Sequence, residues 1–254
     1  MSVAIGIDIG GTNTKLGLVN QDGELLSSRK FPTHERPEFK DFCQQVREVC
    51  DELLRETSER LIGIGVGAPD VELATGNIVN PPNLEWGSVP LKSSLQKQFP
   101  ETLLVIQNDA NAAAVGEKVW GRGQNLRDFA VITLGTGIGT GLFVHNQLVQ
   151  ETEGGHIQIA MGGRACRCGK TGHLEAYGSV RGIKITATEM TGKEWSFAEL
   201  LEAYQKRDPT VERIFEKTAD YLGQGLSAMG NLICFEAFVV TGGVATAGEK
   251  FAKS

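Results

Sequence analysis

The stretch Val3–Thr12, with the sequence VAIGIDIGGT, decides the fold because its form recurs later in the chain. Small and β-branched residues alternate over Val3–Ile9, which predicts a buried strand that ends at a Gly10-Gly11 turn. Residues Ile132–Gly137, ITLGTG, repeat this order of strand and glycine-rich turn, and in both places another strand follows. Chance similarity of two glycine-rich turns is the alternative. The simpler interpretation is two related α/β domains that face each other with a nucleotide between them.

Apolar spacing and turn residues divide the rest of the chain into further elements. Residues 68–90 are polar and rich in proline, and we expect a loop there. We expect strands at 14–19, 24–31, 61–67, 102–107, 128–134, 139–144 and 237–241, and helices at 37–59, 91–99, 109–120, 178–190, 196–205 and 209–234.

Composition excludes several classes of protein. A hydrophobic content of 41% over 254 residues is enough for one large or two medium cores. The net charge of −6 offers no broad basic field for nucleic acid or an anionic membrane. We find no apolar run of spanning length and no export segment, and five cysteines including a C-x-C pair fit a reducing compartment. We therefore expect a cytoplasmic protein that binds neither nucleic acid nor membrane.

The two glycine-rich turns have the chemistry of phosphate-binding loops. Backbone without Cβ atoms at Gly10 and Gly11 lets several N–H groups converge on an oxyanion, and the Thr12 hydroxyl can donate another hydrogen bond. Asp8 is an oxygen ligand suited to Mg²⁺, directly or through water. Taken singly, each turn is explained equally well as a tight hairpin. The same expectation for nucleotide binding extends to Gly135, Thr136 and Gly137 as the second phosphate loop, and to Gly242 and Gly243 near a purine base.

Asp109 is the candidate catalytic base. It follows an expected strand and starts an expected helix, next to Asn108, which can donate and accept hydrogen bonds to a hydroxyl. In this interpretation the Asp109 carboxylate accepts the proton of a sugar hydroxyl that attacks a γ-phosphoryl group. The alternative is a plain N-cap of the helix, which is worth about 1 kcal/mol.

The segment His156–Glu175 carries a candidate metal site. Cys166 and Cys168 form a C-x-C turn, and His173 and His156 complete a tetrahedral set typical of zinc. Four protein ligands leave no open position, so we expect a structural Zn²⁺ rather than a catalytic one. A surface thiol pair is the alternative. The ion would hold two nearby carboxylates, Glu153 and Glu175, together with His156 toward a common point, where they can bind a polyol.

These motifs resemble those of the ROK family of sugar kinases and related repressors, over almost the whole chain. The resemblance implies an actin-like, ribonuclease-H-like α/β fold of two related domains with an interdomain cleft, residues 1–113 and 114–254. It implies ATP, Mg²⁺ and structural Zn²⁺ as cofactors, a hexose as substrate and commonly a homodimer. Residues 82–86, PNLEW, are similar to a sugar-side loop of the family. The resemblance assigns hexose binding to Gly76, Asn83, Asn108, Glu153, His156 and Glu175, catalysis to Asp109, and zinc to His156, Cys166, Cys168 and His173.

Three features depart from the family pattern. His173 stands where the family has a third cysteine, which changes the geometry of the zinc shell. Residues 149–153 form a shorter lead-in than usual, and the second domain ends at Ser254, before the usual C-terminal end. The short lead-in is either a trimmed loop or the result of missing residues. If the end at Ser254 is real, we expect weaker adenosine binding and lower domain stability.

The expected function is ATP-dependent phosphorylation of a hexose, with glucose at its 6-hydroxyl as the first candidate. Kinases of N-acetylmannosamine, N-acetylglucosamine, fructose and allose look similar at these motifs, so the hexose stays open. A sugar-responsive repressor is the alternative from another class, although it would need a DNA-binding helix-turn-helix ahead of Asp8. An inactive sugar-binding or nucleotide-binding relative is the third possibility.

Overall fold

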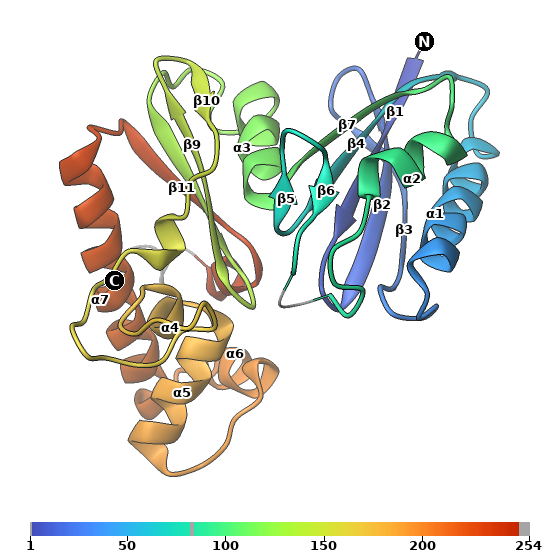
Figure 1. Cartoon of the computed structure of the whole chain (residues 1–254). Helices are drawn as coiled ribbons and strands as arrows, with labels where there is room; N and C mark the ends of the chain where they lie inside the picture. Colours follow the sequence, from blue (N-terminus) through green and yellow to red (C-terminus); the bar gives the residue numbers. More distant parts are fainter. Residues whose placement is uncertain (1, 82–83, 249–254) are drawn as a thin grey trace. The chain divides into compact units, whose positions relative to one another are not determined.

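The computed structural model describes residues 2–81 and 84–248, and the chain divides into two compact units, 1–112 and 113–254 (Figure 1). We describe each unit by itself. The elements that begin in unit 1 are β1 (Ser2–Ile9), β2 (Asn13–Asn20), β3 (Leu25–Pro32), α1 (Phe39–Leu54), β4 (Arg60–Ala68), β5 (Val71–Glu72), β6 (Asn77–Ile78), α2 (Leu91–Gln98), β7 (Leu103–Asn108) and α3 (Asp109–Val119).

The main sheet of unit 1 has the strand order β3-β2-β1-β4-β7. β1, β2 and β3 are joined by hairpins and run antiparallel, whereas β4 and β7 run parallel to β1. Parallel neighbours end at the same edge of a sheet. The segments that follow β1, β4 and β7 therefore start at one edge, and these segments carry the first glycine loop, Gly10–Thr12, and Asp109.

The core of unit 1 lies on one face of this sheet, under α1 and α2. Phe42, Val46 and Leu53 lie on the inner face of α1 and are fully buried. Burial of side chains of this size stabilises the fold by roughly 1.5–3 kcal/mol each. Cys43 and Cys50 are buried on the same helix and belong to this core.

Unit 2 holds a second sheet and a layer of helices. Its elements are β8 (Phe129–Leu134), β9 (Ile138–Val144), β10 (Gln147–Val149), η1 (Gly154–His156), α4 (Glu175–Gly178), α5 (Val180–Thr191), α6 (Phe197–Gln205), α7 (Pro209–Leu232), β11 (Ala237–Thr241) and η2 (Gly243–Ala247). The strand order is β10-β9-β8-β11, with β11 parallel to β8 and the other pairs antiparallel.

Both faces of the second sheet are covered, so β8 is apolar except at Thr133. Ala130, Ile132 and Leu134 belong to the larger core, which includes residues of α5, α6 and α7. Phe129 and Val131 point to the other face, where they pack in a smaller cluster with Ala114 of α3. A strand that is buried on both sides shows a continuous apolar run rather than alternation.

Local sequence explains where the helices of unit 2 begin. The Asp208 side chain accepts hydrogen bonds from the N–H groups of Thr210 and Val211, and Pro209 occupies the first position of α7. Ser196 and Glu199 form a reciprocal capping box at α6. None of the helices in residues 2–81 and 84–248 combines the length and apolar character needed to span a bilayer.

Most of the expected elements are confirmed, and the differences have local causes. The helix expected at 178–190 is observed as α5, which begins at Val180 because the Ser179 side chain caps it, and the extended backbone of Ser179 separates it from the short helix α4. The helix expected at 37–59 covers only Phe39–Leu54. Residues 68–90 were expected as loop, but part of this segment pairs as the short hairpin β5-β6, with Gly76 at a positive φ in its turn.

Candidate active site

The carboxyl ends of parallel strands bring two acidic side chains near each other in unit 1. β1 pairs with β4 so that Asp8 lies beside Gly67, and β4 pairs with β7 so that Gly67 lies beside Gln107. Asp109 follows at the start of α3. A Cβ added at Gly67 would lie 3.4 Å from the Asp109 Cα and 3.4 Å from the Ala112 Cβ. The lack of a side chain at Gly67 therefore lets α3 begin close to β4.

Asn108, rather than Asp109, supplies the cap of α3. The Asn108 Oδ1 accepts hydrogen bonds from the N–H groups of Ala110 at 3.0 Å and of Asn111 at 3.2 Å. Asp109 Oδ1 accepts one hydrogen bond, also from the Ala110 N–H, at 2.8 Å. Because Asn108 already satisfies both donors, the cap does not require a carboxylate at Asp109.

The surroundings of Asp109 raise the pKa of its carboxyl group. The main cause is the loss of solvation among nearby protein atoms, even though part of the side chain remains exposed. The negative charge of Asp8 adds to the shift, and the hydrogen bond from Ala110 opposes it. A raised pKa makes the ionised carboxylate a stronger proton acceptor than an ordinary aspartate.

Lys15 is a neighbour of Asp8 that the sequence analysis did not select. The two residues stand opposite each other in the β1-β2 register, and Lys15 Nζ lies 3.2 Å from Asp8 Oδ2. Both side chains are more than half exposed, at 63% and 55%. Such an exposed pair exchanges readily with water and ions, so Asp8 can accept a cation in place of Lys15. The hairpin register was the signal that could have identified this pair.

The first glycine loop, Gly10–Thr12, is held by Thr33 at the end of β3. The Thr33 hydroxyl donates to the Gly10 carbonyl oxygen at 2.6 Å, and the Thr33 N–H donates to the Thr12 carbonyl oxygen at 3.0 Å. The Thr14 hydroxyl lies 3.1 Å from that of Thr33, and both threonines are fully buried. Sequence analysis missed Thr33, because no local pattern links it to a loop more than twenty residues away.

Gly76 and Asn83 were expected to bind the hexose, before and in the sugar-side loop, and the structure describes only Gly76. Gly76 is buried and has a φ of 70°, and an added Cβ would lie 2.7 Å from the Lys92 Cβ. Both facts require glycine there for reasons of packing alone. Asn83 lies outside the described residues, so its expected contact with substrate stays a prediction.

The second glycine loop, Gly135–Gly141, connects β8 to β9 and continues into β9 in unit 2. The Gly135 N–H donates to the Gly137 carbonyl oxygen at 3.0 Å, which closes a tight turn. The Gly135 carbonyl oxygen accepts the Val180 N–H at 2.9 Å, and the Ile138 N–H donates to Glu175 Oε2 at 3.1 Å. Residues downstream of the candidate metal ligands thus hold this loop on both sides, and Thr136 remains exposed between them.

Gly242 and Gly243 leave the same edge of the sheet as the second glycine loop. β8 and β11 are parallel, with Thr133 beside Thr241, so both glycine turns start from neighbouring strand ends. Gly242 has a φ of 95°, and an added Cβ would lie 2.5 Å from the Leu134 carbonyl oxygen. This close backbone approach agrees with a shared ligand-facing edge.

The four expected zinc ligands are brought together. One ligand atom from each of His156, Cys166, Cys168 and His173 lies within 4.8 Å of the others. The Cys168 Sγ lies 3.2 Å from His173 Nδ1, and the rings of His156 and His173 are 5.2 Å apart. Zinc bonds of about 2.0–2.3 Å put the donor atoms of a tetrahedral site less than about 4 Å apart. The donor set and its spacing therefore fit Zn²⁺ after small side-chain adjustments.

The protonation of the isolated ligands also bears on metal binding. Burial lowers the pKa of His173, with the nearby His156 and Lys170 adding to the shift, so its imidazole is neutral and ready to coordinate. Burial raises the pKa of the Cys166 thiol to about 11, so that a bound metal must displace its proton. Glu153 Oε2 lies 3.5 Å from His156 Nδ1, a contact of the kind that fixes the orientation of a ligand ring.

An open pocket of about 830 Å³ in unit 2 begins at Thr136 of the second glycine loop. One face of α5 forms its wall with Arg181, Lys184 and Thr188, and Trp195 lies among its other lining residues. In the described part of the chain, neither Arg181 nor Lys184 forms an ion pair. The pocket is continuous with an expected phosphate loop, and its charged lining residues are Arg167, Arg181, Lys184, Glu189 and Glu194.

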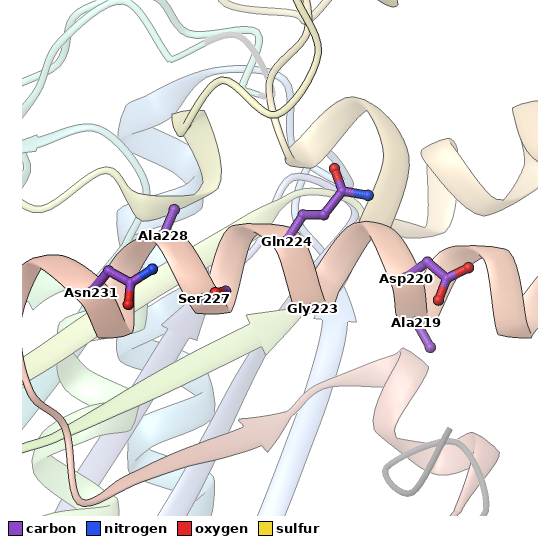
Figure 2. A pocket seen from close by; sticks show the side chains of 7 residues that line it. All are labelled: Ala219, Asp220, Gly223, Gln224, Ser227, Ala228 and Asn231. Atoms are coloured by element: carbon purple, nitrogen blue, oxygen red, sulfur yellow. The ribbon is translucent and has the colours of Figure 1, made fainter.

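A second hollow, of about 760 Å³, is formed by seven residues of α7 alone (Figure 2). Its lining side chains are small or carry amide, hydroxyl and carboxylate groups, among them Gln224, Asp220 and Asn231. It contains no cation and no glycine loop. These residues do not form a phosphate-binding or catalytic group.

Comparisons with known proteins agree with this arrangement. A glucokinase of Halalkalibacterium halodurans is 32% identical over 98% of this chain and 82% of its own length. A xylose repressor of Bacillus subtilis is 28% identical over 93% of this chain and 63% of its own length. The crystal structure of a ROK family glucokinase from Streptomyces griseus, in complex with glucose and AMPPNP, superposes with a TM-score of 0.87 at 29% identity, over 99% of this chain and 86% of that one.

The expected actin-like, ribonuclease-H-like α/β fold is thereby confirmed. The profile of the ROK family matches residues 4–253, which is nearly the whole chain. Since this match includes both glycine loops, the start of α3 and the metal segment, the chain belongs to the ROK family.

Proposed function

We propose that the protein is an ATP-dependent hexose kinase that phosphorylates glucose at its 6-hydroxyl. Glucokinases are similar to this chain over almost all of its length, and one solved relative holds both glucose and an ATP analogue. The observation that carries the proposal is the position of Asp109. Its carboxylate stands near Asp8, has a raised pKa and is not needed to cap α3.

In the proposed reaction, a residue of unit 1 activates the sugar hydroxyl that accepts the phosphoryl group. Asp109 accepts the proton of the sugar hydroxyl while the hydroxyl oxygen forms a bond to the γ-phosphorus of ATP. The bond between that phosphorus and the bridging oxygen breaks, and ADP leaves with the electron pair. Such a reaction asks the protein mainly for alignment and charge neutralisation. Asn108 uses its Oδ1 for the cap, so its NH₂ group is the part that can bind a sugar hydroxyl.

The donor is proposed to bind through the glycine loops. The N–H groups of Gly10, Gly11 and Thr12 and those of the second glycine loop suit phosphate oxygens. Asp8 would hold Mg²⁺, which neutralises phosphate charge when bound. We place the nucleoside of ATP along the pocket that begins at Thr136. Arg181 lies at its phosphate end, and the Trp195 ring lies near the base.

The sugar is proposed to contact Glu153 and His156 as well as Asn108. The zinc shell would support this group, because His156 is one of its ligands and Glu153 lies next to it. Gly76 and Asn83 stay predictions. A homodimer and a cytoplasmic location also stay predictions.

The test is an assay of ADP release with a panel of hexoses and their N-acetyl derivatives. We expect glucose to give the highest kcat/KM and N-acetylmannosamine, N-acetylglucosamine, fructose and allose lower values. A higher value for one of these sugars would reassign the substrate and keep the kinase. Absence of ADP release with every sugar, in a protein that is folded and loaded with metal, would reject the kinase.

A sugar-binding regulator is the second candidate, since xylose repressors are similar to this chain over 93% of its length. The repressor extends beyond the matched region, because the match covers only 63% of its length. Saturable sugar binding without any ADP release would favour this candidate. Calorimetric titration with the same sugar panel measures it directly.

A further inference from the structure

Glu175 connects the candidate metal ligands to the second glycine loop. One of its carboxylate oxygens, Oε2, accepts the Ile138 N–H at 3.1 Å. The other, Oε1, lies 3.7 Å from the Cys166 Sγ. A single carboxylate therefore contacts both a metal ligand and the backbone of the loop.

Gly137 lies close to this carboxylate. A Cβ added at Gly137 would lie 2.5 Å from Glu175 Oε2, a distance at which the carboxylate would have to move away. A side chain at this position would therefore displace the end of the Glu175 side chain from the Ile138 N–H. The hydrogen bond between the neighbouring Ile138 N–H and Glu175 joins residues that are 37 positions apart in the chain.

The segment that leads into His156 also contacts the second glycine loop. The Gly154 N–H donates to the Thr140 hydroxyl at 2.9 Å, and the Thr152 hydroxyl donates to the Thr140 carbonyl oxygen at 3.0 Å. A Cβ added at Gly155 would lie 2.2 Å from the Ile138 carbonyl oxygen. The residues that lead directly into His156 therefore pack on Ile138–Thr140.

The metal site joins these two supports. His156 belongs to the first segment, whereas Cys166, Cys168 and His173 belong to the second, which continues into Glu175. An ion bound by all four residues would link the two segments at one point and close the stretch of chain between His156 and Cys166 into a loop. Closing such a loop reduces the conformational freedom of both segments before a ligand arrives.

We propose that Glu175 is a positioning residue through which metal occupancy orders the second glycine loop and strengthens nucleotide binding. By linkage, a bound nucleotide must then strengthen metal binding by the same factor. The proposal rests on the proposed function in one respect, that this loop binds the phosphates of the nucleotide.

The first experiment measures ADP affinity by calorimetry in metal-loaded and chelator-treated protein. We expect roughly tenfold weaker binding after metal removal, within the usual range for coupled sites. In Glu175→Ala, the ADP affinities of loaded and stripped protein should differ less than in wild type, because one of the two supports is missing. Glu175→Gln keeps an oxygen that can accept the Ile138 N–H, so it should restore most of the dependence. Glu202→Ala is the matched control, since Glu202 is an exposed carboxylate of α6 that pairs with Lys206 and lies outside the metal cluster.

Two further readouts keep the test independent of catalysis. Cobalt bound to thiolates gives a charge-transfer absorption band. ADP should lower the cobalt concentration needed to saturate this band, and the shift should be smaller in Glu175→Ala than in wild type. Hydrogen–deuterium exchange in the peptide around Ile138 should be faster in loaded Glu175→Ala than in loaded wild type. This comparison holds even if metal removal unfolds unit 2.

Each outcome has a distinct meaning. Equal exchange around Ile138 in the two loaded proteins, or equal ADP affinity of folded loaded and stripped wild type, would overturn the coupling. Loss of hexose phosphorylation with the coupling retained would reject only the proposed function. If ADP fails to bind in any state while metal still slows exchange at Ile138, the loop is ordered by the metal but is not a nucleotide site, and the proposal is overturned as stated.

Discussion

The hydroxyl of Thr33 donates a hydrogen bond of 2.6 Å to the carbonyl oxygen of Gly10. It thereby fixes the backbone of the first glycine loop from inside the protein. Thr14 supports it with a second hydroxyl at 3.1 Å, in a place that water does not reach.

Thr33→Val should therefore damage both stability and donor binding. The substitution keeps the shape of the side chain but leaves the buried Gly10 carbonyl oxygen without this partner, which costs about 1–3 kcal/mol. We expect a lower free energy of unfolding in urea and a higher KM for ATP. Thr33→Ser is the matched control, because it keeps the hydroxyl. Equal effects of the two substitutions would show that the hydrogen bond to Gly10 is unimportant.

Asp109→Asn should remove the catalytic base and leave the fold in place. General base catalysis contributes typically about 10²–10⁴-fold, so we expect kcat to fall by at least that range. Calorimetric binding of glucose should change little. Asn108→Ala, in contrast, should lower the stability of the fold by about 1 kcal/mol, because the cap of α3 is missing. A near-normal rate for Asp109→Asn would reject the assignment of the base.

The same substitution has a pH dependence with a defined sign. The folded pKa of Asp109 is raised, mainly by loss of solvation, so ionisation opposes folding at pH values above that pKa. Any stability that the carboxyl group contributes is present below the unfolded pKa of an ordinary aspartate and is lost as the pH rises through the folded pKa. Asp109→Asn should therefore have a melting temperature equal to or above that of wild type at pH 7. This difference should shrink as the pH falls toward 4. A melting temperature that drops at pH 7 would mean that the carboxylate stabilises the helix instead.

Arg164 is a buried connection between the metal segment and α5. Its guanidinium group donates to the carbonyl oxygens of Ala176 at 3.3 Å and Gly182 at 3.2 Å and pairs with Glu189. It also lies 4.7 Å from the centre of the Tyr177 ring, and its side chain is only 12% exposed. Arg164→Ala removes these hydrogen bonds and the ion pair, while the Thr186 hydroxyl still donates to the Gly182 carbonyl oxygen, and we expect a loss of roughly 2–4 kcal/mol. Chemical denaturation measures it. Glu189→Gln should cost clearly less, since Glu189 is half-exposed, and equal losses would contradict a role for the backbone contacts.

Metal content is checked by elemental analysis of protein purified without chelator, where we expect about one zinc per chain. Cys166→Ser and His173→Ala should each lower the bound zinc strongly, because a tetrahedral structural site needs all four ligands. Cys234→Ser is the control, as Cys234 is an exposed thiol outside the cluster. Absence of zinc from wild type would reject the metal site outright.

The sequence was sufficient where a local pattern carries the information. Alternation over Val3–Ile9 followed by two glycines predicts a strand and a loop, and the spacing of Cys166, Cys168 and His173 predicts a metal site, since each signal lies within about ten residues. The pairs that join distant segments left no such signal. Thr33 with Gly10, and Glu175 with Ile138, are 23 and 37 positions apart, and they become neighbours only through strand pairing and the packing of the metal segment. The role of Arg164 could not be predicted for the same reason, because its partners lie on two later helices, α4 and α5.

The pocket beside Thr136 leads to a prediction about donor specificity. Arg181 and Lys184 lie one turn apart on the wall of α5, which rises by about 1.5 Å per residue, so residues 181–188 extend along roughly 10 Å of the pocket. A nucleoside monophosphate can span that length.

Arg181→Ala and Lys184→Ala should each raise the KM for ATP roughly tenfold, the effect of losing one hydrogen bond to a charged group. The KM for glucose should stay unchanged. Lys193→Ala is the matched control, because Lys193 lies 4.0 Å from the centre of the Trp195 ring but does not line the pocket. If all three alanine variants keep the wild-type KM for ATP, the nucleoside lies elsewhere, and Gly242 and Gly243 become the next place to test.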